Sequence, residues 1–247
     1  MSIKTTLNYS PNFNPTKRKP KDIKFIILHY TGMKKESAAI KRLTSIQSEV
    51  GCHYLIKNNG EIITMVPDLY EAWHAGKSSW KKYKSLNKNS IGIEISNPGH
   101  EFNYKNFSNK QIISILRLGK FLIKKYSVQS RNILGHSDIA VDRKKDPGEK
   151  FPWKYLAHNK IGIWHKLSNK TLKQSRMQKI NKKSKEFFLK NLTKIGYSKS
   201  NTKNLDKKKN LIFVIKAFQR RFRQDLVNGK IDKECLLISK NLLKKFN

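Results

Sequence analysis

Short apolar runs separated by polar loops dominate the first two thirds of the chain. The run at 24–28 is rich in β-branched residues and leads into His29, which predicts a buried strand that opens into a loop at this histidine. Residues 53–66 hold an Asn-Gly pair between two β-rich runs, which is typical of a hairpin with a type I′ turn. Functional side chains are common where strands end, so His29 is a candidate.

The next elements alternate between strand and helix periodicity. Residues 90–96 carry isoleucine at every second position and Glu94 on the other face, so this acid is expected to face solvent or a cleft. Helical spacing predicts helices over 37–47 and over 108–125, the second beginning with a capping box of Ser108 and Gln111. A short strand is expected at 132–134. The resulting fold class is α/β, a central mixed β-sheet flanked by helices.

The two ends of the chain differ from this middle part. Residues 1–22 are polar and predict a surface arm before an α/β domain at 23–165. A lysine-dense stretch at 166–180 indicates either a basic linker or the solvent-exposed surface of a helix. Helical periodicity at 187–196, 211–222 and 236–246 predicts a small C-terminal three-helix domain at 181–247.

Composition adds a strong positive charge. The 53 Lys and Arg residues exceed the 17 Asp and Glu residues by 36, which favours a polyanionic partner, although an A/T-biased coding sequence would give the same excess of lysine. Cys52 and Cys235 are far apart and are expected to be ordinary thiols. Neither a membrane span nor a signal peptide is visible, so the protein is expected to be cytosolic or to have lost an export signal from this numbering.

Candidate metal ligands are dispersed along the chain. No HExxH and no CxxC motif occurs. His29 ends the first strand, His136 follows the last one and Asp146 lies in the loop after it, so the three side chains converge if those strands are neighbours. Spacing alone leaves other histidines in competition, and they are His53, His74 and His100.

Five motifs resemble those of a known family. They are IILHYTG, GCHYLIKNNGEI, EAWHAGKSSW, SIGIEISNPG and ILGHSDIAVDRKKDPGEKFPW, and they begin at residues 26, 51, 71, 90 and 133. Their order and spacing resemble the zinc-dependent N-acetylmuramoyl-L-alanine amidases of type 2, which are related to phage lysozyme-type amidases and to animal peptidoglycan recognition proteins. The resemblance covers residues 23 to about 164.

The resemblance implies a role for each matching position. His29, His136 and Asp146 would hold one Zn²⁺ per catalytic domain. Glu94 would be the general base, and Lys144 would stabilise the oxyanion. The expected substrate-binding residues are Trp73, His74, Ala75 and Gly76; His53 is expected to be structural, with contact to the substrate as the alternative.

The C-terminal part resembles the small three-helix peptidoglycan-binding domain. The elements are Gly196-Tyr197, Ala217-Phe218-Gln219 and Gly229 to Asp232, in the expected order. Under either this reading or a generic helical bundle, Phe218 and Phe222 are expected to be core residues. The resemblance implies that the domain raises the local enzyme concentration on the wall polymer.

The expected activity is hydrolysis of the amide between N-acetylmuramic acid, or its anhydro form, and L-alanine in peptidoglycan or muropeptides. Two other readings remain: a non-catalytic peptidoglycan-binding protein, and a basic nucleic-acid-binding protein without a recognised binding motif. We expect a monomer acting in the cell envelope, with a cytoplasmic location as the alternative.

Overall fold

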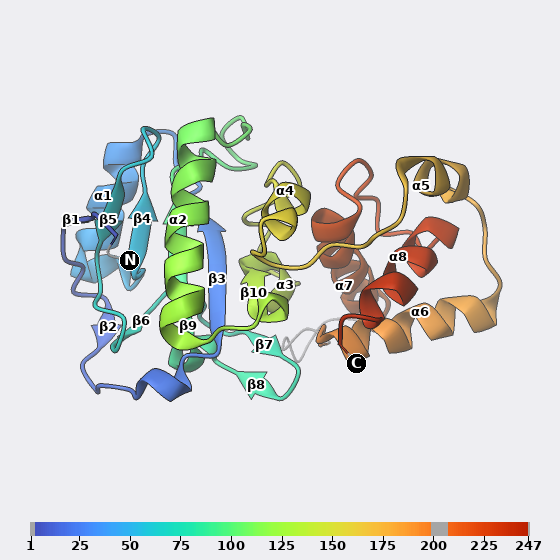
Figure 1. Ribbon diagram of the computed structural model, residues 1–247, viewed down its shortest axis with the longest axis horizontal. Helices are drawn as coiled ribbons and strands as arrows, with labels where there is room; N and C mark the ends of the chain where they lie inside the picture. The colour runs from blue at the N-terminus through green and yellow to red at the C-terminus, as the bar shows by residue number, and fades with distance from the viewer. Residues whose placement is uncertain (1–2, 199–206, 247) are drawn as a thin grey trace.

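The computed structural model describes residues 3–198 and 207–246; residues 1 and 2 of the predicted arm, and 199–206 and 247 of the predicted C-terminal domain, lie outside this part. A six-stranded mixed sheet forms the centre of the N-terminal part (Figure 1). Its strand order is β1 (Thr6–Leu7), β5 (Ile62–Thr64), β4 (Tyr54–Ile56), β9 (Ser90–Ile95), β3 (Phe25–Tyr30) and β10 (Ile133–Gly135). The predicted α/β class is confirmed.

The central strand β3 positions the functional site. It runs parallel to β9 on one side and to β10 on the other, and all its residues up to His29 are buried. A strand that is buried on both faces has a continuous run of apolar residues in its sequence, and residues 25–28 form such a run. The register sets His29 opposite Glu94 and Leu28 opposite Gly135, so the carboxyl ends of three strands meet at one edge.

Helices cover both faces of the sheet. On one face α2 (Asn109–Tyr126) packs its buried residues, such as Leu118, against Ile26 and Leu28. The capping box is confirmed: Ser108 Oγ accepts from the Gln111 N–H at 3.2 Å, and the Gln111 side chain accepts from the Ser108 N–H at 3.0 Å. On the other face, α1 (Glu36–Thr44) covers β4 and β5.

The C-terminal helices lie beside β10 on that second face (Figure 1). They are α6 (Lys182–Ile195), α7 (Lys207–Phe222) and α8 (Lys233–Leu243), preceded by α5 (Asn169–Ser175) inside the expected linker. Phe218 and Phe222 are buried, as predicted, in a cluster that also contains Phe25 and Ile27 of the sheet. One hydrophobic core therefore joins the helices to the sheet.

The N-terminal segment is packed against the sheet. β1 pairs with β5, and β2 (Phe13–Asn14) pairs with β6 (Glu71–Ala72). Ser10 and Asn12 are fully buried, and Asn12 Nδ2 donates to the Val50 carbonyl at 2.7 Å. The polar composition of residues 1–22 predicts a surface arm, and strands of two residues leave no periodicity that would indicate the pairing seen here.

The hairpin of β4 and β5 forms as predicted, but with another turn. The Gly60 N–H donates to the Lys57 carbonyl at 2.9 Å, and only Gly60 has a positive φ, +85°, within this turn. This is a type I turn followed by a left-handed glycine, because a type I′ turn needs positive φ at both central residues.

The remaining elements are short: β7 (Ser79–Trp80), β8 (Tyr83–Lys84), α3 (His136–Ile139), α4 (Trp153–His158) and four 3₁₀ turns within the described residues. Cys52 and Cys235 are buried free thiols. Among the described helices, none combines the length and the apolarity that crossing a membrane requires.

Candidate active site

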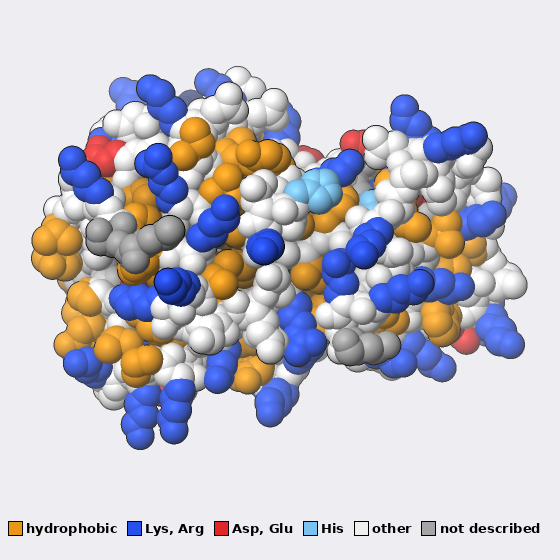
Figure 2. Space-filling view, in the orientation of Figure 1, with side chains coloured by type: hydrophobic (Ala, Val, Ile, Leu, Met, Phe, Trp, Pro, Cys, Tyr) orange, Lys and Arg blue, Asp and Glu red, His pale blue; other side chains and the backbone are white. Residues whose placement is uncertain are grey.

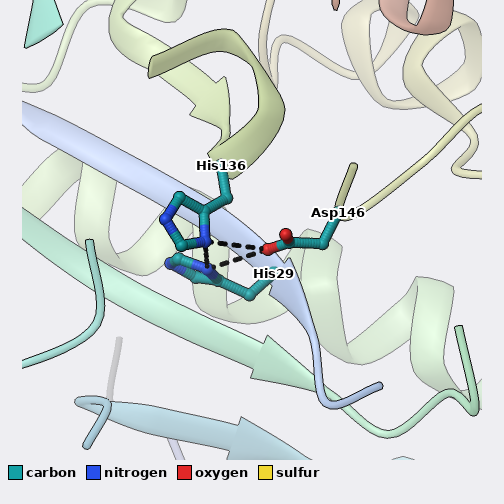
Figure 3. Close-up of side chains that lie close together, drawn as sticks. All are labelled: His29, His136 and Asp146. Carbon is teal, nitrogen blue, oxygen red and sulfur yellow. Dashed lines mark hydrogen bonds and ion pairs between the residues drawn. The ribbon is translucent and has the colours of Figure 1, made fainter. Parts of the chain in front are cut away.

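Three side chains predicted as metal ligands meet at the sheet edge (Figure 3). His29 lies on β3, His136 is the first residue after the neighbouring strand β10, and Asp146 lies in the loop after α3. The Nδ1 atoms of the two histidines are 2.9 Å apart, and they lie 3.0 and 3.1 Å from Asp146 Oδ2. All three residues are at most 6% exposed.

A chain of hydrogen bonds fixes the proton on His29. Ser90 Oγ donates to the Leu86 carbonyl at 2.6 Å, so it must accept from His74 Nε2 at 3.0 Å. His74 Nδ1 is then an acceptor, and His29 Nε2 donates to it at 3.0 Å. A neutral imidazole has one N–H, so the network leaves a lone pair on His29 Nδ1.

The imidazole of His136 carries its proton on the same nitrogen, Nε2, as that of His29. Its Nε2 donates to the Ala75 carbonyl at 3.2 Å, which leaves the lone pair on Nδ1. Partners of this kind orient the metal-ligating histidines of known proteins.

The arrangement fits a metal ion. Two Nδ1 lone pairs and one carboxylate oxygen face one another, and nothing in the network supplies a proton between them. Ligand atoms around a tetrahedral metal with bonds of about 2.0–2.1 Å lie about 3.3 Å apart, close to the observed separations. His29, His136 and Asp146 can therefore hold a metal ion.

The local environment keeps these groups in the required protonation states. Burial lowers the pKa of His29 to about 4, so its imidazole is neutral at pH 7. Burial alone would raise the pKa of Asp146, but the close approach of His136 and His29 outweighs burial and holds this pKa far below its usual range. A neutral imidazole and an ionised carboxylate are the ligand forms that bind metals.

Glu94 lies beside the three ligands. It is 9% exposed, and its Oε2 atom has no hydrogen-bond partner among the described residues. Burial and the charge of Asp146 raise the pKa of Glu94 well above its ordinary value, while a cation at the neighbouring site would act in the opposite direction. A carboxyl group with a raised pKa and a free oxygen is suited to carry a proton.

A groove of about 410 Å³ opens above these residues. Glu94, His136 and Asp146 line it, and so do Lys144, which is half-buried, and its neighbour Lys145, which is exposed. The positive charge of Lys144 also acts to lower the pKa of Glu94 against the effect of burial, so this lysine lies close to the site.

The residues predicted to bind substrate divide into two groups. Trp73, His74 and Gly76 line the groove, and His74 also supports His29. Ala75 and His53 are fully buried. The Ala75 carbonyl accepts from His136, and His53 Nδ1 accepts from the Gly92 N–H at 2.9 Å, so in this structure both serve the scaffold.

Several residues around the groove were not predicted from the sequence. The guanidinium of Arg143 packs against Gly76. It donates to the carbonyl of Ala75 at 2.5 Å and to the carbonyl of Lys77 at 2.7 Å. Arg42 lines the groove from the end of α1, which no local pattern marks. His100, to which no role was assigned, also lines the groove, and its Nδ1 lies 2.8 Å from the Tyr30 hydroxyl.

Comparisons with known proteins agree with this geometry. The family model described as N-acetylmuramoyl-L-alanine amidase matches residues 19–149, just over half of the chain. The N-acetylmuramoyl-L-alanine amidase AmiD of Escherichia coli is 33% identical over 237 residues, which are 91% of this chain and 83% of AmiD. The 1,6-anhydro-N-acetylmuramyl-L-alanine amidase AmpD of the same species is 39% identical over 104 residues, covering 42% of this chain and 55% of AmpD.

Solved structures show the same fold over the full length. The complex of E. coli AmiD with anhydro-N-acetylmuramic acid-L-Ala-D-γ-Glu-L-Lys has a TM-score of 0.78 at 32% identity and covers 94% of this chain and 92% of its own. AmpDh3 of Pseudomonas aeruginosa in complex with anhydromuramic pentapeptide has a TM-score of 0.78 at 30% identity, and the match covers 99% of this chain and 96% of the AmpDh3 chain. The chain described here belongs to the N-acetylmuramoyl-L-alanine amidase family.

Proposed function

We propose that this chain hydrolyses the amide between N-acetylmuramic acid, or its anhydro form, and L-alanine, with Zn²⁺ held by His29, His136 and Asp146. The observation that carries the proposal is the meeting of three metal-binding lone pairs, with Glu94 beside them, below a groove open to a substrate. The two similar structures are complexes with anhydromuramic peptides, which supports this substrate class.

A zinc ion held by His29, His136 and Asp146 would supply a Lewis acid for the amide carbonyl and would lower the pKa of water from about 15.7 to about 7. Glu94 takes the proton that the attacking water loses, because its Oε2 lies beside the ligands and has no hydrogen-bond partner among the described residues. Glu94 then gives this proton to the leaving nitrogen, so the products are a carboxyl group on the lactyl ether and a free amino terminus on alanine.

Lys144 supplies positive charge where the carbonyl oxygen becomes negative. Its ammonium group lines the groove next to Asp146, and donors placed in this way stabilise the tetrahedral oxyanion. Arg42 and Arg143, which also line the groove, complement the carboxylates of the stem peptide. This combination favours an enzyme over a non-catalytic wall-binding protein.

The positive charge is spread widely over the molecule. Figure 2 shows lysine and arginine side chains scattered across the whole visible face, over both the catalytic part and the C-terminal helices. A distributed charge of this kind suits attraction to an extended anionic polymer, and we propose an envelope location on this ground. Binding to isolated cell walls should weaken as salt rises; binding independent of salt would assign no recognition role to the charge.

The test is digestion of purified peptidoglycan and of anhydro-muropeptides, with products identified by mass. We expect free stem peptide from at least one substrate, loss of the product with a chelator, and recovery on adding Zn²⁺. A zinc-loaded protein that releases no stem peptide from either substrate would contradict the proposal, and retention of the wall without turnover would support the non-catalytic reading.

A further inference from the structure

We propose that Arg221 and Tyr197, from the C-terminal helical part, are positioning residues for the metal site. They hold Asp138 and, through it, the short helix α3 that begins with His136. The inference rests on the proposed function only in naming zinc as the ion. It assigns to the C-terminal helices a role in the active site that is separate from any binding to the wall.

Asp138 receives two hydrogen bonds from the C-terminal part. Arg221 Nη1 donates to Asp138 Oδ2 at 2.6 Å, and the Tyr197 hydroxyl donates to Asp138 Oδ1 at 2.6 Å. Arg221 Nη2 also donates to the carbonyl of Ile133 on β10, at 2.9 Å. The three side chains are at most 3% exposed, so the contact is a buried, charged junction between regions that lie more than 50 residues apart.

The same carboxylate forms the start of α3. Asp138 Oδ2 accepts from the Gly135 N–H at 2.8 Å, the bond that caps this helix, and His136 is the next residue. The Ser137 N–H donates to the Asp146 carbonyl at 2.8 Å. Two of the three metal ligands are therefore attached to the segment that Asp138 holds.

This segment needs support from outside. A helix of four residues cannot be stable on its own, because isolated helices shorter than about 12–15 residues are marginal in water. Support comes from α7, which lies next to α3 in Figure 1 and shares a hydrophobic cluster with Leu134 and Ile139. Gln224 Nε2, just after α7, donates to the Phe151 carbonyl at 2.7 Å, so this region also contacts the end of the ligand loop.

Arginine at 221 is suited to this position. Its planar guanidinium binds the carboxylate and the carbonyl at once, and it lies over the Trp153 ring, 4.4 Å from the centroid. Lysine has the charge but not the fork of donors, so it cannot reproduce all these contacts.

The chain offers a matched control. Arg223 is also 2% exposed, but its partners, Asp232 and Glu234, belong to the C-terminal part alone. Replacing Arg221 or Arg223 by lysine disturbs a buried ion pair in either case. Only Arg221→Lys disturbs the junction with the metal-binding segment.

The experiment uses the full-length zinc-loaded protein and measures the rate of zinc transfer to a chromogenic chelator, well below the unfolding temperature of every variant. Loss of a residue that supports a metal ligand typically costs about 10–100-fold in metal affinity or activity. We expect Arg221→Lys and Tyr197→Phe to release zinc about tenfold faster, with kcat on muropeptide lowered and KM within about twofold. Arg223→Lys should lower the unfolding temperature and release zinc at the wild-type rate.

Tyr197→Phe keeps the ring that packs against Trp80, 4.9 Å between centroids, so it removes one hydroxyl without emptying the core. Wild-type zinc release in both Arg221→Lys and Tyr197→Phe would overturn the inference, and so would equally fast release in Arg223→Lys. Because zinc release is measured without substrate, it still decides the inference if the wild-type protein cleaves no muropeptide, a result that would contradict the proposed function alone.

Discussion

Two buried glutamates show how the catalytic part differs from the C-terminal helices. Glu234 on α8 is fully buried, and both its oxygens accept from Arg176, each at 2.8 Å. Glu94 on β9 is almost as buried, yet its Oε2 has no partner among the described residues. A buried carboxylate without a partner is costly, so its persistence beside a groove points to chemistry rather than to stability.

Glu94→Gln should give the largest effect. The amide keeps the size of the side chain but cannot take a proton from water, and general acid–base groups contribute about 10²–10⁴-fold. We expect kcat/KM to fall within that range while zinc content and unfolding temperature match the wild type. Turnover near the wild-type value with zinc bound would contradict the assigned role.

Lys144→Ala should follow closely. Removing one donor to an oxyanion typically lowers kcat by about 10²–10³-fold, and the groove places this ammonium group beside Asp146. Lys84→Ala is the control, because Lys84 is an exposed lysine on β8 that is not among the residues lining the groove. Steady-state kinetics on anhydro-muropeptide should show a large loss in the first variant and a change within about twofold in the second; equal losses would remove the distinction.

Glu234→Gln tests the other half of the comparison. Breaking one partner out of a buried ion pair costs about 3–5 kcal/mol, so the free energy of unfolding should fall by about 3 kcal/mol in denaturant titration. The kcat of the folded variant should stay near the wild-type value, since the ion-pair partners of Glu234 among the described residues, Arg176 and Arg223, do not line the groove. A strong loss of kcat without a loss of stability would contradict the structural reading of this residue.

His165 should give the smallest effect, as a dependence of stability on pH. Burial lowers its pKa to about 4 from an ordinary value near 6.5, so as pH falls the unfolded chain takes up this proton first. Its contribution is present in full above about pH 6.5 and is lost as pH falls towards 4. His165→Gln should flatten the unfolding free energy in this window relative to the wild type; an unchanged slope would contradict the shift.

Much of the sheet follows from local pattern, because buried strands and capped helices leave signals in neighbouring residues. The apolar run before His29, the isoleucine alternation around Glu94 and the Ser108 capping box each describe their element correctly. Short elements leave no such signal, so the two-residue strands of the N-terminal segment and the four-residue α3 were not predicted.

The site required information beyond local pattern. His29 and His136 are 107 residues apart, and spacing alone did not distinguish them from His53, His74 and His100 as metal ligands. The family motifs identified these two histidines as the expected ligands. The motifs also gave no reason to connect Arg221 with Asp138, 83 residues earlier, because that contact depends on how α7 packs against β10. The role of Ser90 in orienting His74 likewise becomes visible only through hydrogen bonds in three dimensions.

The most direct test of the central claim is a zinc titration of the metal-free protein while the release of stem peptide from an anhydro-muropeptide is followed by mass. We expect no release without metal, a linear rise with added Zn²⁺ and saturation at one equivalent per chain. Full release from rigorously metal-free protein, or none at one bound equivalent, would contradict it.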